Sequence, residues 1–235
     1  MKNPASASAE KIILLVALLA VVGLTGGGVW AGDEVLPGEK IIDPQAPVIG
    51  PAGAKAVIVE FADFQCPYCA VMARFVEQLQ ESAPQEIRVV WMDRPLDGMA
   101  EDGFAFHPYA MIAHEAAAEA QAQGKFWEMQ QWIFLNQASL FPRERPRNIV
   151  DYELKLRALQ QRLTDAGSEL GLDKIKMRLA LTNHLRRKEV SKRLTMAKDL
   201  EIYSTPTVFV NGVNLGYDPD AVRSAVEQAV GRSLF

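Results

Sequence analysis

The stretch AVIVEFADFQCPYCA, residues 56–70, contains both cysteines of this 235-residue chain, Cys66 and Cys69. Its first part, Ala56–Phe61, is almost entirely apolar, which predicts a strand that is buried on both faces of a sheet. From Tyr68 onward, apolar side chains recur every three or four residues, which predicts an amphipathic helix. The cysteines are therefore expected where a buried strand leads into a helix, with Cys66 at the helix N-terminus.

This position favours redox chemistry. Pro67 fits the first helical position because no backbone N–H is needed there. Unpaired amides and the positive end of the helix dipole favour a thiolate at Cys66, and a thiolate is the attacking species in thiol–disulfide exchange. A second thiol three residues later can resolve the mixed disulfide. We therefore expect Cys66 to be an exposed nucleophile and Cys69 the resolving thiol, one turn further in.

Two other uses of the cysteines are less well supported. A structural disulfide between neighbours would close a very short loop and stabilise the fold little. Half of a zinc site would need two more ligands, and His107, His114 and His184 have no ligand spacing relative to each other. His107 and His114 are instead expected at helix ends or on the surface of the protein. No metal and no cofactor is expected.

The N-terminal segment indicates the compartment. Lys2 and Lys11 precede an uncharged run, residues 12–32, which is long enough to span a bilayer. Residues 12–24 also have the length of a signal-peptide core. Residues 1–32 are therefore a cleaved signal peptide or an N-terminal membrane anchor, and both alternatives remain open. Both export the rest of the chain, because the lysines stay inside.

The remaining chain is expected to form one domain, residues 47–235, after a polar tether, residues 33–46. Ordinary globular composition and a net charge of −4 give no reason to expect a nucleic-acid partner. Residues 47–51 predict an edge strand, and residues 87–92 a second buried strand parallel to the first. Residues 99–200 carry helix signals alone, which predicts an all-helical insertion.

Strand signals return near the C-terminus. Residues 207–210 predict a strand, Asn211-Gly212 a hairpin turn, and residues 213–215 its returning strand. A last helix is expected after Asp218, ending at Gly231. The order of strand, helix, strand, helical insertion, hairpin and helix predicts an α/β fold of the thioredoxin type.

The segments VEFADFQCPYC and TPTVFVNG, residues 205–212, resemble the DsbA-like thiol:disulfide oxidoreductases of bacteria. The resemblance extends from about Pro47 to the C-terminus and implies a thioredoxin-like fold with a helical insertion. It also implies that Thr205-Pro206 is a cis bond that places Thr205 beside Cys66, where its backbone pairs with a substrate peptide. The alternative is a trans proline that opens a strand.

Glu60 is the one ionisable residue in Ala56–Phe61. Burial is expected to raise its pKa, so that its carboxyl can give or take the proton that Cys69 exchanges in each cycle. The resembled family carries a buried acid at this position. Alternatively, the side chain reaches solvent at the strand end. Asp63, in the following loop, is expected to be solvated or to cap the helix.

The dipeptide Pro67-Tyr68 is expected to modulate the active site, because its groups lie over the Cys66 sulfur. A histidine is common at the second position in the DsbA-like family, where it adds a positive charge near the thiolate. Tyr68 cannot add one. We therefore expect a low Cys66 pKa but a less strongly oxidising protein than the members with histidine.

Together these features predict an extracytoplasmic disulfide oxidoreductase, in the periplasm or on the outer face of the cell membrane. Its expected partners are reduced or unfolded exported proteins, and the resemblance to the DsbA-like family implies a quinone-linked membrane protein that reoxidises it. A reductase or isomerase would use the same atoms. Such isomerases generally dimerise through an extra N-terminal domain, and residues 33–46 are too short for one, which favours an oxidase and a monomer. A peptide-binding holdase with incidental cysteines is a further alternative.

Overall fold

The structure is a computed structural model that describes residues 36–235. The predicted signal peptide or anchor, residues 1–32, lies outside the described residues. Within residues 36–235, no helix combines the length and the apolar character needed to cross a membrane.

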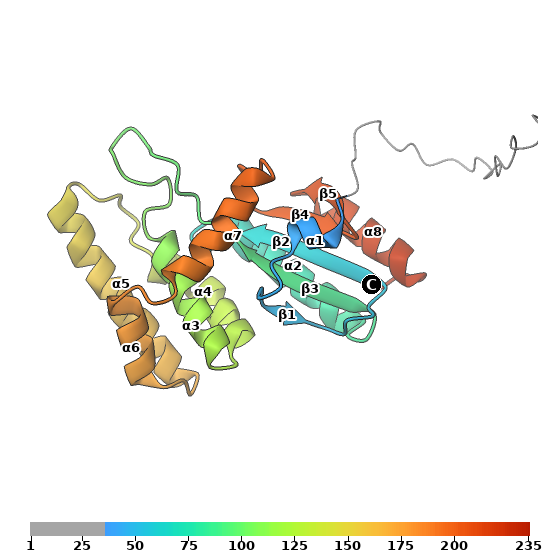
Figure 1. Cartoon of the computed structure of the whole chain (residues 1–235), viewed down its shortest axis with the longest axis horizontal. Coiled ribbons are helices and arrows are strands. Elements are labelled where there is room, and N and C mark those ends of the chain that lie inside the picture. Colours follow the sequence, from blue (N-terminus) through green and yellow to red (C-terminus); the bar gives the residue numbers. More distant parts are fainter. Residues whose placement is uncertain (1–35) are drawn as a thin grey trace, which may run out of the picture. The chain divides into compact units, whose positions relative to one another are not determined.

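A five-stranded sheet forms the centre of the described part, with helices on both faces and a group of helices beside it (Figure 1). In chain order the elements are α1 (Gly38–Ile41), β1 (Val48–Ile49), β2 (Ala56–Ala62), α2 (Pro67–Ser82), β3 (Ile87–Asp93), α3 (Ala110–Ala122), α4 (Phe126–Leu140), α5 (Ile149–Glu169), α6 (Lys174–Thr182), α7 (Arg187–Asp199), β4 (Thr207–Val210), β5 (Val213–Gly216) and α8 (Pro219–Val230). The strand order is β1-β3-β2-β4-β5.

The two apolar runs of the sequence form the central strands, as predicted. β2 and β3 pair in parallel, with Ile58 opposite Val89. β4 pairs antiparallel with the other edge of β2, and β1 and β5 complete the sheet as antiparallel edge strands. α2 connects the two parallel strands, so the predicted strand–helix–strand unit is confirmed.

Each face of the sheet has its own apolar core because successive side chains of a strand point to opposite faces. Ile58 points to the face that is covered by α2 and α8, where it lies in the same cluster as Val76 and Val226. Val59 points to the opposite face and clusters with Ile41 and Ala197, from α1 and α7. Glu60, two residues after Ile58, therefore points towards α2.

The chain between β3 and β4 forms the helices α3 to α7, which lie beside the sheet in Figure 1. Asp173 caps α6 by accepting from the amides of Ile175 and Lys176. A third apolar cluster joins these helices to the strand ends and includes Cys66 and Cys69. The thioredoxin-like α/β fold expected from the sequence is confirmed.

The C-terminal hairpin also agrees with the prediction. Asn211 and Gly212 have φ angles of 48° and 86°, which a two-residue turn of this type requires. Asp218 caps α8 and Gly231 ends it.

The prediction of a polar tether over residues 33–46 is wrong for its described part. Residues 38–41 form α1, and Ile41 is 1% exposed against the sheet. Asp43 is also buried and binds Lys192 through a 2.7 Å ion pair. The prolines and the absence of periodicity suggested a linker, but Ile41, Asp43 and Ala46 bury their side chains and hold this segment on the domain.

Candidate functional site

The two cysteines lie where the sheet, α2 and the helical insertion meet. Cys66 is the N-cap of α2, and Pro67 occupies the first turn. The Cys66 carbonyl accepts hydrogen bonds from the amides of Cys69 (3.2 Å) and Ala70 (3.4 Å). The local sequence thus places the Cys66 thiol at the positive end of the helix, as predicted.

Cys66 is more deeply buried than the sequence suggested. Its exposed fraction is 4% and that of Cys69 is 0%, so the prediction of an exposed nucleophile is wrong. The cause is a segment 139 residues away in sequence: the Cys66 thiol donates to the carbonyl of Thr205 over 3.4 Å. Cys66 is nevertheless the more exposed of the two cysteines, so an incoming sulfur can reach Cys66 but not Cys69.

The two thiols differ strongly in acidity. The hydrogen bond from the Cys69 thiol and the amides of Cys69 and Tyr68 lower the pKa of Cys66 to about 6, although burial opposes them. Burial raises the pKa of Cys69 well above 9.0, and the charge on Cys66 adds to that effect. At neutral pH the pair therefore holds one thiolate, on Cys66, and one thiol, on Cys69.

Thr205 and Pro206 approach the cysteines from the loop before β4. The Thr205-Pro206 peptide is cis, so the alternative of a trans proline is wrong. Thr205 lies beside Cys66, as the resemblance implied, and its buried hydroxyl has no hydrogen-bond partner within residues 36–235. Thr205 therefore contributes both a carbonyl and an unpaired hydroxyl to the site.

Glu60 is buried beneath α2. It is 2% exposed, so the alternative that it reaches solvent is wrong, and burial raises its pKa to about 8. Its side chain lines a cavity of about 60 Å³ together with Ala73 and Glu77 of α2. Ala73 lies one helical turn after Cys69, so Glu60 and Cys69 are on the same side of α2.

The cavity leaves space beside the Glu60 carboxyl for a group that can carry its proton. Its Oε1 atom has no hydrogen-bond partner in the described part of the chain, and Gln80 and Gln130 line the same cavity. A buried carboxyl in a mainly apolar cavity that also holds polar side chains is suited to hold a proton and to release it.

Tyr68, between the cysteines, points outward. It is exposed, and its ring packs edge-on against Tyr217 with the centroids 5.6 Å apart. It presents an aromatic surface beside Cys66 rather than a charge.

Asp63, which was expected to be solvated or to cap α2, is fully buried. Its amide donates to the Cys69 sulfur over 3.4 Å. Its carboxylate accepts from the amides of Gln65 and Leu96, both at 2.6 Å, and from His107 at 2.9 Å. The expectation was wrong because the partners of Asp63 include residues 33 and 44 positions later in the chain.

The insertion supplies further residues that the sequence did not indicate. Gln137 donates to the carbonyls of Phe64 (2.9 Å) and Cys66 (2.8 Å). His114, which was expected at a helix end or on the surface, is completely buried, and its Nε2 accepts from the Phe64 amide over 3.4 Å. These contacts fix the loop before Cys66. Nothing in the local sequence pattern marks them.

The structure thus brings together Cys66, Cys69 and Thr205 and places Glu60 one layer below. This arrangement can perform thiol–disulfide exchange, since it combines an acidic thiol, a resolving thiol and a buried proton carrier.

Comparison with known families agrees with this chemistry. A family model described as thioredoxin matches residues 43–228. Among curated proteins, the chain is 32% identical over 200 residues to Na(+)/H(+) antiporter NhaA 1 of Salinispora arenicola, and 27% identical over 188 residues to NhaA 1 of Mycolicibacterium vanbaalenii. These matches cover 81% and 78% of this chain but 27% of each antiporter, so the chain spans about a quarter of their length.

Solved structures show the same fold. Oxidised BdbD from Bacillus subtilis matches with a TM-score of 0.61 and 19% identity, covering 80% of this chain and 94% of that one. α-DsbA1 from Wolbachia pipientis matches with a TM-score of 0.60 and 17% identity, covering 82% and 97%. MdbA, a thiol-disulfide oxidoreductase from Corynebacterium diphtheriae, matches with a TM-score of 0.56 and 19% identity, covering 79% and 89%. The chain therefore belongs to the thioredoxin family and has the fold of its DsbA-like thiol–disulfide oxidoreductases.

Proposed function

We propose that the protein oxidises the thiols of exported proteins through a Cys66–Cys69 disulfide. The observation that carries the proposal is the difference between the two thiols: the pKa of Cys66 is lowered to about 6, whereas that of Cys69 is raised. A stabilised thiolate favours the reduced form of the pair, and a pair that is stable when reduced oxidises other thiols.

The exchange takes two displacements. A substrate thiolate attacks Cys66 of the disulfide, a substrate–Cys66 bond forms, and Cys69 leaves with the electron pair of the broken bond. A second substrate thiolate then attacks the substrate sulfur, which closes the substrate disulfide and releases the Cys66 thiolate. Two electrons pass from the substrate to the cysteine pair, and a quinone-linked membrane protein is proposed to remove them.

We propose that Glu60 supplies the proton that Cys69 takes up in this cycle. Cys69 leaves as a thiolate but is a thiol in the reduced protein, because burial disfavours its charge. Glu60, with its pKa raised to about 8, is protonated at neutral pH and lies on the same side of α2. It can therefore supply that proton and recover it when the pair is reoxidised.

A groove next to the cysteines fits a polypeptide substrate. It has a volume of about 630 Å³, lies between α2 and α4, and includes Ala70, the residue after Cys69, in its lining. Val71 and Leu135 line it and are exposed. We propose that unfolded chains place apolar side chains in this groove while their backbone pairs with the segment at Thr205.

We place the activity outside the cytoplasm, at or near the membrane. The uncharged run of residues 12–32, as a signal or an anchor, supports this location. The match to antiporters also supports it, since in those membrane proteins a domain similar to this one is joined to a transporter. The proposed partners are reduced exported proteins, on which we propose that the protein acts as a monomer.

Trapping with a two-cysteine peptide tests the roles of the thiols. Mixed with the disulfide form of the peptide, Cys69→Ser is expected to accumulate a mixed disulfide at Cys66, because the Cys66 thiolate attacks the peptide disulfide, one peptide thiolate leaves, and no Cys69 thiol resolves the new bond. Cys66→Ser is expected to form no mixed disulfide. A Cys66→Ser variant that still oxidises the peptide would overturn the role of Cys66, and one that retains full biological activity would favour the holdase alternative.

The redox equilibrium with glutathione tests the direction. We expect a potential above about −200 mV, towards the range of periplasmic oxidants. A potential near about −270 mV, the thioredoxin value, would overturn the oxidising direction and favour a reductase.

A further inference from the structure

A segment of the insertion is bonded directly to the loop that leads into the active site. His107 donates to the Asp63 carboxylate over 2.9 Å, and the Tyr109 amide donates to the Gln65 side chain, also over 2.9 Å. The His107 amide donates to the carbonyl of Leu96, whose own amide donates to Asp63. Residues 107–109 are therefore held alongside residues 63–65, next to Cys66.

Asp63 connects His107 to both cysteines. Its carbonyl accepts from the Cys66 amide over 3.1 Å, and its amide donates to the Cys69 sulfur over 3.4 Å. The Asp63 side chain is fully buried, so solvent screens its charge little. An unbalanced carboxylate at this position would oppose a thiolate on Cys66, and a cation bound to it removes that opposition.

The surroundings of His107 favour the imidazolium. Burial lowers the pKa of His107, but its hydrogen bond to Asp63 and the negative charges of Asp63 and Cys66 outweigh burial, so the net direction is upward. Arg145 is the charged group that acts in the opposite direction. The Phe106 ring packs against the imidazole with the centroids 5.0 Å apart, an arrangement that also suits a cation.

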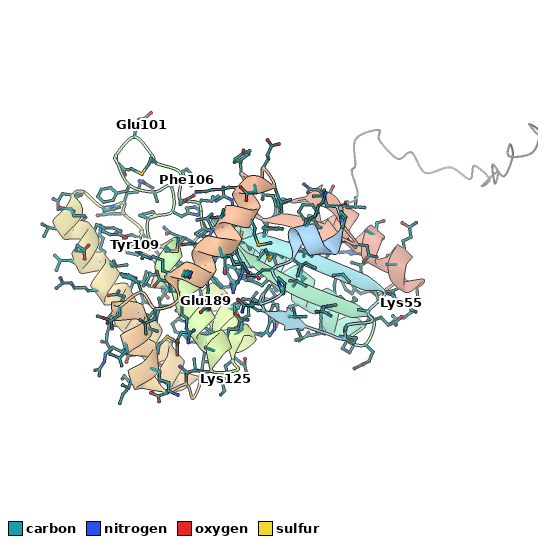
Figure 2. All side chains as sticks on the ribbon, viewed as in Figure 1. Lys55, Glu101, Phe106, Tyr109, Lys125 and Glu189 are labelled. Carbon is teal, nitrogen blue, oxygen red and sulfur yellow. The ribbon has the colours of Figure 1, made fainter. Side chains whose placement is uncertain are left out.

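Figure 2 shows Phe106 and Tyr109, the labelled neighbours of His107, on the segment that leads into α3. His107 itself is mostly buried, with 14% of its side chain exposed. Its charge therefore acts at short range in a partly desolvated position, where it is worth more than on the open surface.

We propose that His107, held by Asp63, is the electrostatic partner of the Cys66 thiolate and supplies from the insertion the positive charge that Tyr68 lacks. His107 acts on the Cys66 sulfur through its positive charge and through its hydrogen bond to Asp63, so it is a positioning residue. The proposal rests on the proposed function in that it takes Cys66 as the reacting thiol. When the second substrate thiolate displaces Cys66, the electron pair stays on the Cys66 sulfur opposite the imidazolium, and His107 transfers no proton.

The direct test compares wild type with His107→Asn. The Cys66 titration is followed by thiolate absorbance at 240 nm, and the redox equilibrium by glutathione. We expect the Cys66 pKa to rise by about one unit. The equilibrium constant for reduction by glutathione should fall about tenfold, which corresponds to about 30 mV.

Two further variants separate charge from structure. His107→Lys keeps the positive charge and is expected to keep the Cys66 pKa within about half a unit of wild type, consistent with the charge effect of an ion pair. His184→Asn removes a histidine that binds Glu115 and Arg187 and is expected to change neither measurement. A folded His107→Asn protein with an unchanged Cys66 titration would overturn the proposal.

The wild-type protein provides a second test that needs no variant. If the Cys66 thiolate stabilises the imidazolium, the NMR titration of His107 must shift to lower pH when the pair is oxidised, because the thiolate charge disappears. His184 serves as the control in the same spectra. An identical His107 titration in both redox states would overturn the proposal. The absolute potential of wild type decides the oxidising direction separately, so a failure of one proposal is distinguishable from a failure of the other.

Discussion

Replacing Glu60 with glutamine removes the ionisable carboxyl beneath α2 and keeps nearly the same side-chain shape. Burial raises the pKa of Glu60 from 4.5 to about 8. In the unfolded chain the carboxyl ionises near 4.5, whereas in the folded protein it stays protonated up to about 8. Between these two values ionisation favours the unfolded state, so the contribution of Glu60 to wild-type stability falls as the pH rises.

The size of this effect follows from the two pKa values. One pKa unit corresponds to about 1.36 kcal/mol, so at pH 7 the buried carboxyl costs about 3 kcal/mol of unfolding free energy. The cost is close to zero at pH 4 and approaches about 5 kcal/mol above pH 8. Glu60→Gln lacks this cost, so we expect its stability gain over wild type to grow with pH.

The assay is urea unfolding of the oxidised protein at pH 4, 5.5, 7 and 8.5, since neither cysteine titrates in the disulfide. An unpaired amide in the cavity adds an offset that does not vary with pH, so the slope of the gain against pH is the decisive quantity. Glu81→Gln, which removes an exposed carboxylate from the same helix, is the matched control. A gain of the same size at every pH would refute the argument that Glu60 is protonated in the folded protein.

Two further predictions concern the thiols and the insertion. The pKa of Cys66 is lowered to about 6 from an ordinary 9.0, so the reduced protein should gain stability over the oxidised one by about 1.4 kcal/mol per pH unit between pH 6 and pH 9. This advantage is lost as the pH falls through 6. Paired urea titrations of the two redox forms measure the difference in unfolding free energy, and a difference that does not change with pH would contradict the prediction. Arg193→Met should lower the unfolding free energy by about 3–5 kcal/mol, because it leaves the buried Asp93 carboxylate without its arginine, while Asp43 keeps its pair with Lys192. Lys198→Met, which breaks an exposed pair on the same helix, should cost less than about 1 kcal/mol; equal losses in urea unfolding would count against this account.

The parts of the fold that the sequence predicted are those with local causes. β2 and β3 are continuous apolar runs, and the start of α2 follows from a proline in its first turn. The hairpin follows from Asn211-Gly212, whose positive φ angles few other pairs adopt at low cost. In each case the signal lies within a few residues of the structure that it specifies.

The errors at the site concern contacts between distant segments. Cys66 was expected to be exposed, because a helix N-terminus in isolation faces solvent, but Thr205 covers it from 139 positions later in the chain. Asp63 and His107 each resemble an ordinary polar residue of a loop or helix end. Their pairing across 44 residues becomes visible only when the strand end and the insertion are placed together.

The basic residues of α6 and α7 illustrate the same limit. The density of basic residues over 174–198 alone predicts solvated helix faces, yet Arg193 is 2% exposed and binds the Asp93 carboxylate of β3. Arg186 and Arg187 pair with Glu119 and Glu115 of α3. A run of charges of one sign is informative only together with the location of the opposite charges, which here lie on a strand and a helix far earlier in the chain.

These long-range contacts give the insertion a role in the chemistry. The loop between β2 and α2 carries backbone groups that are buried and require partners. Gln137 satisfies the carbonyls of Phe64 and Cys66, and His114 accepts from the Phe64 amide. Removing these side chains would leave the carbonyl and the amide of Phe64 unpaired, two residues before Cys66, at a cost of about 1–3 kcal/mol each. The insertion therefore fixes the geometry in which the helix N-terminus acts on Cys66, and the acidity of that thiol depends on residues from both parts of the fold.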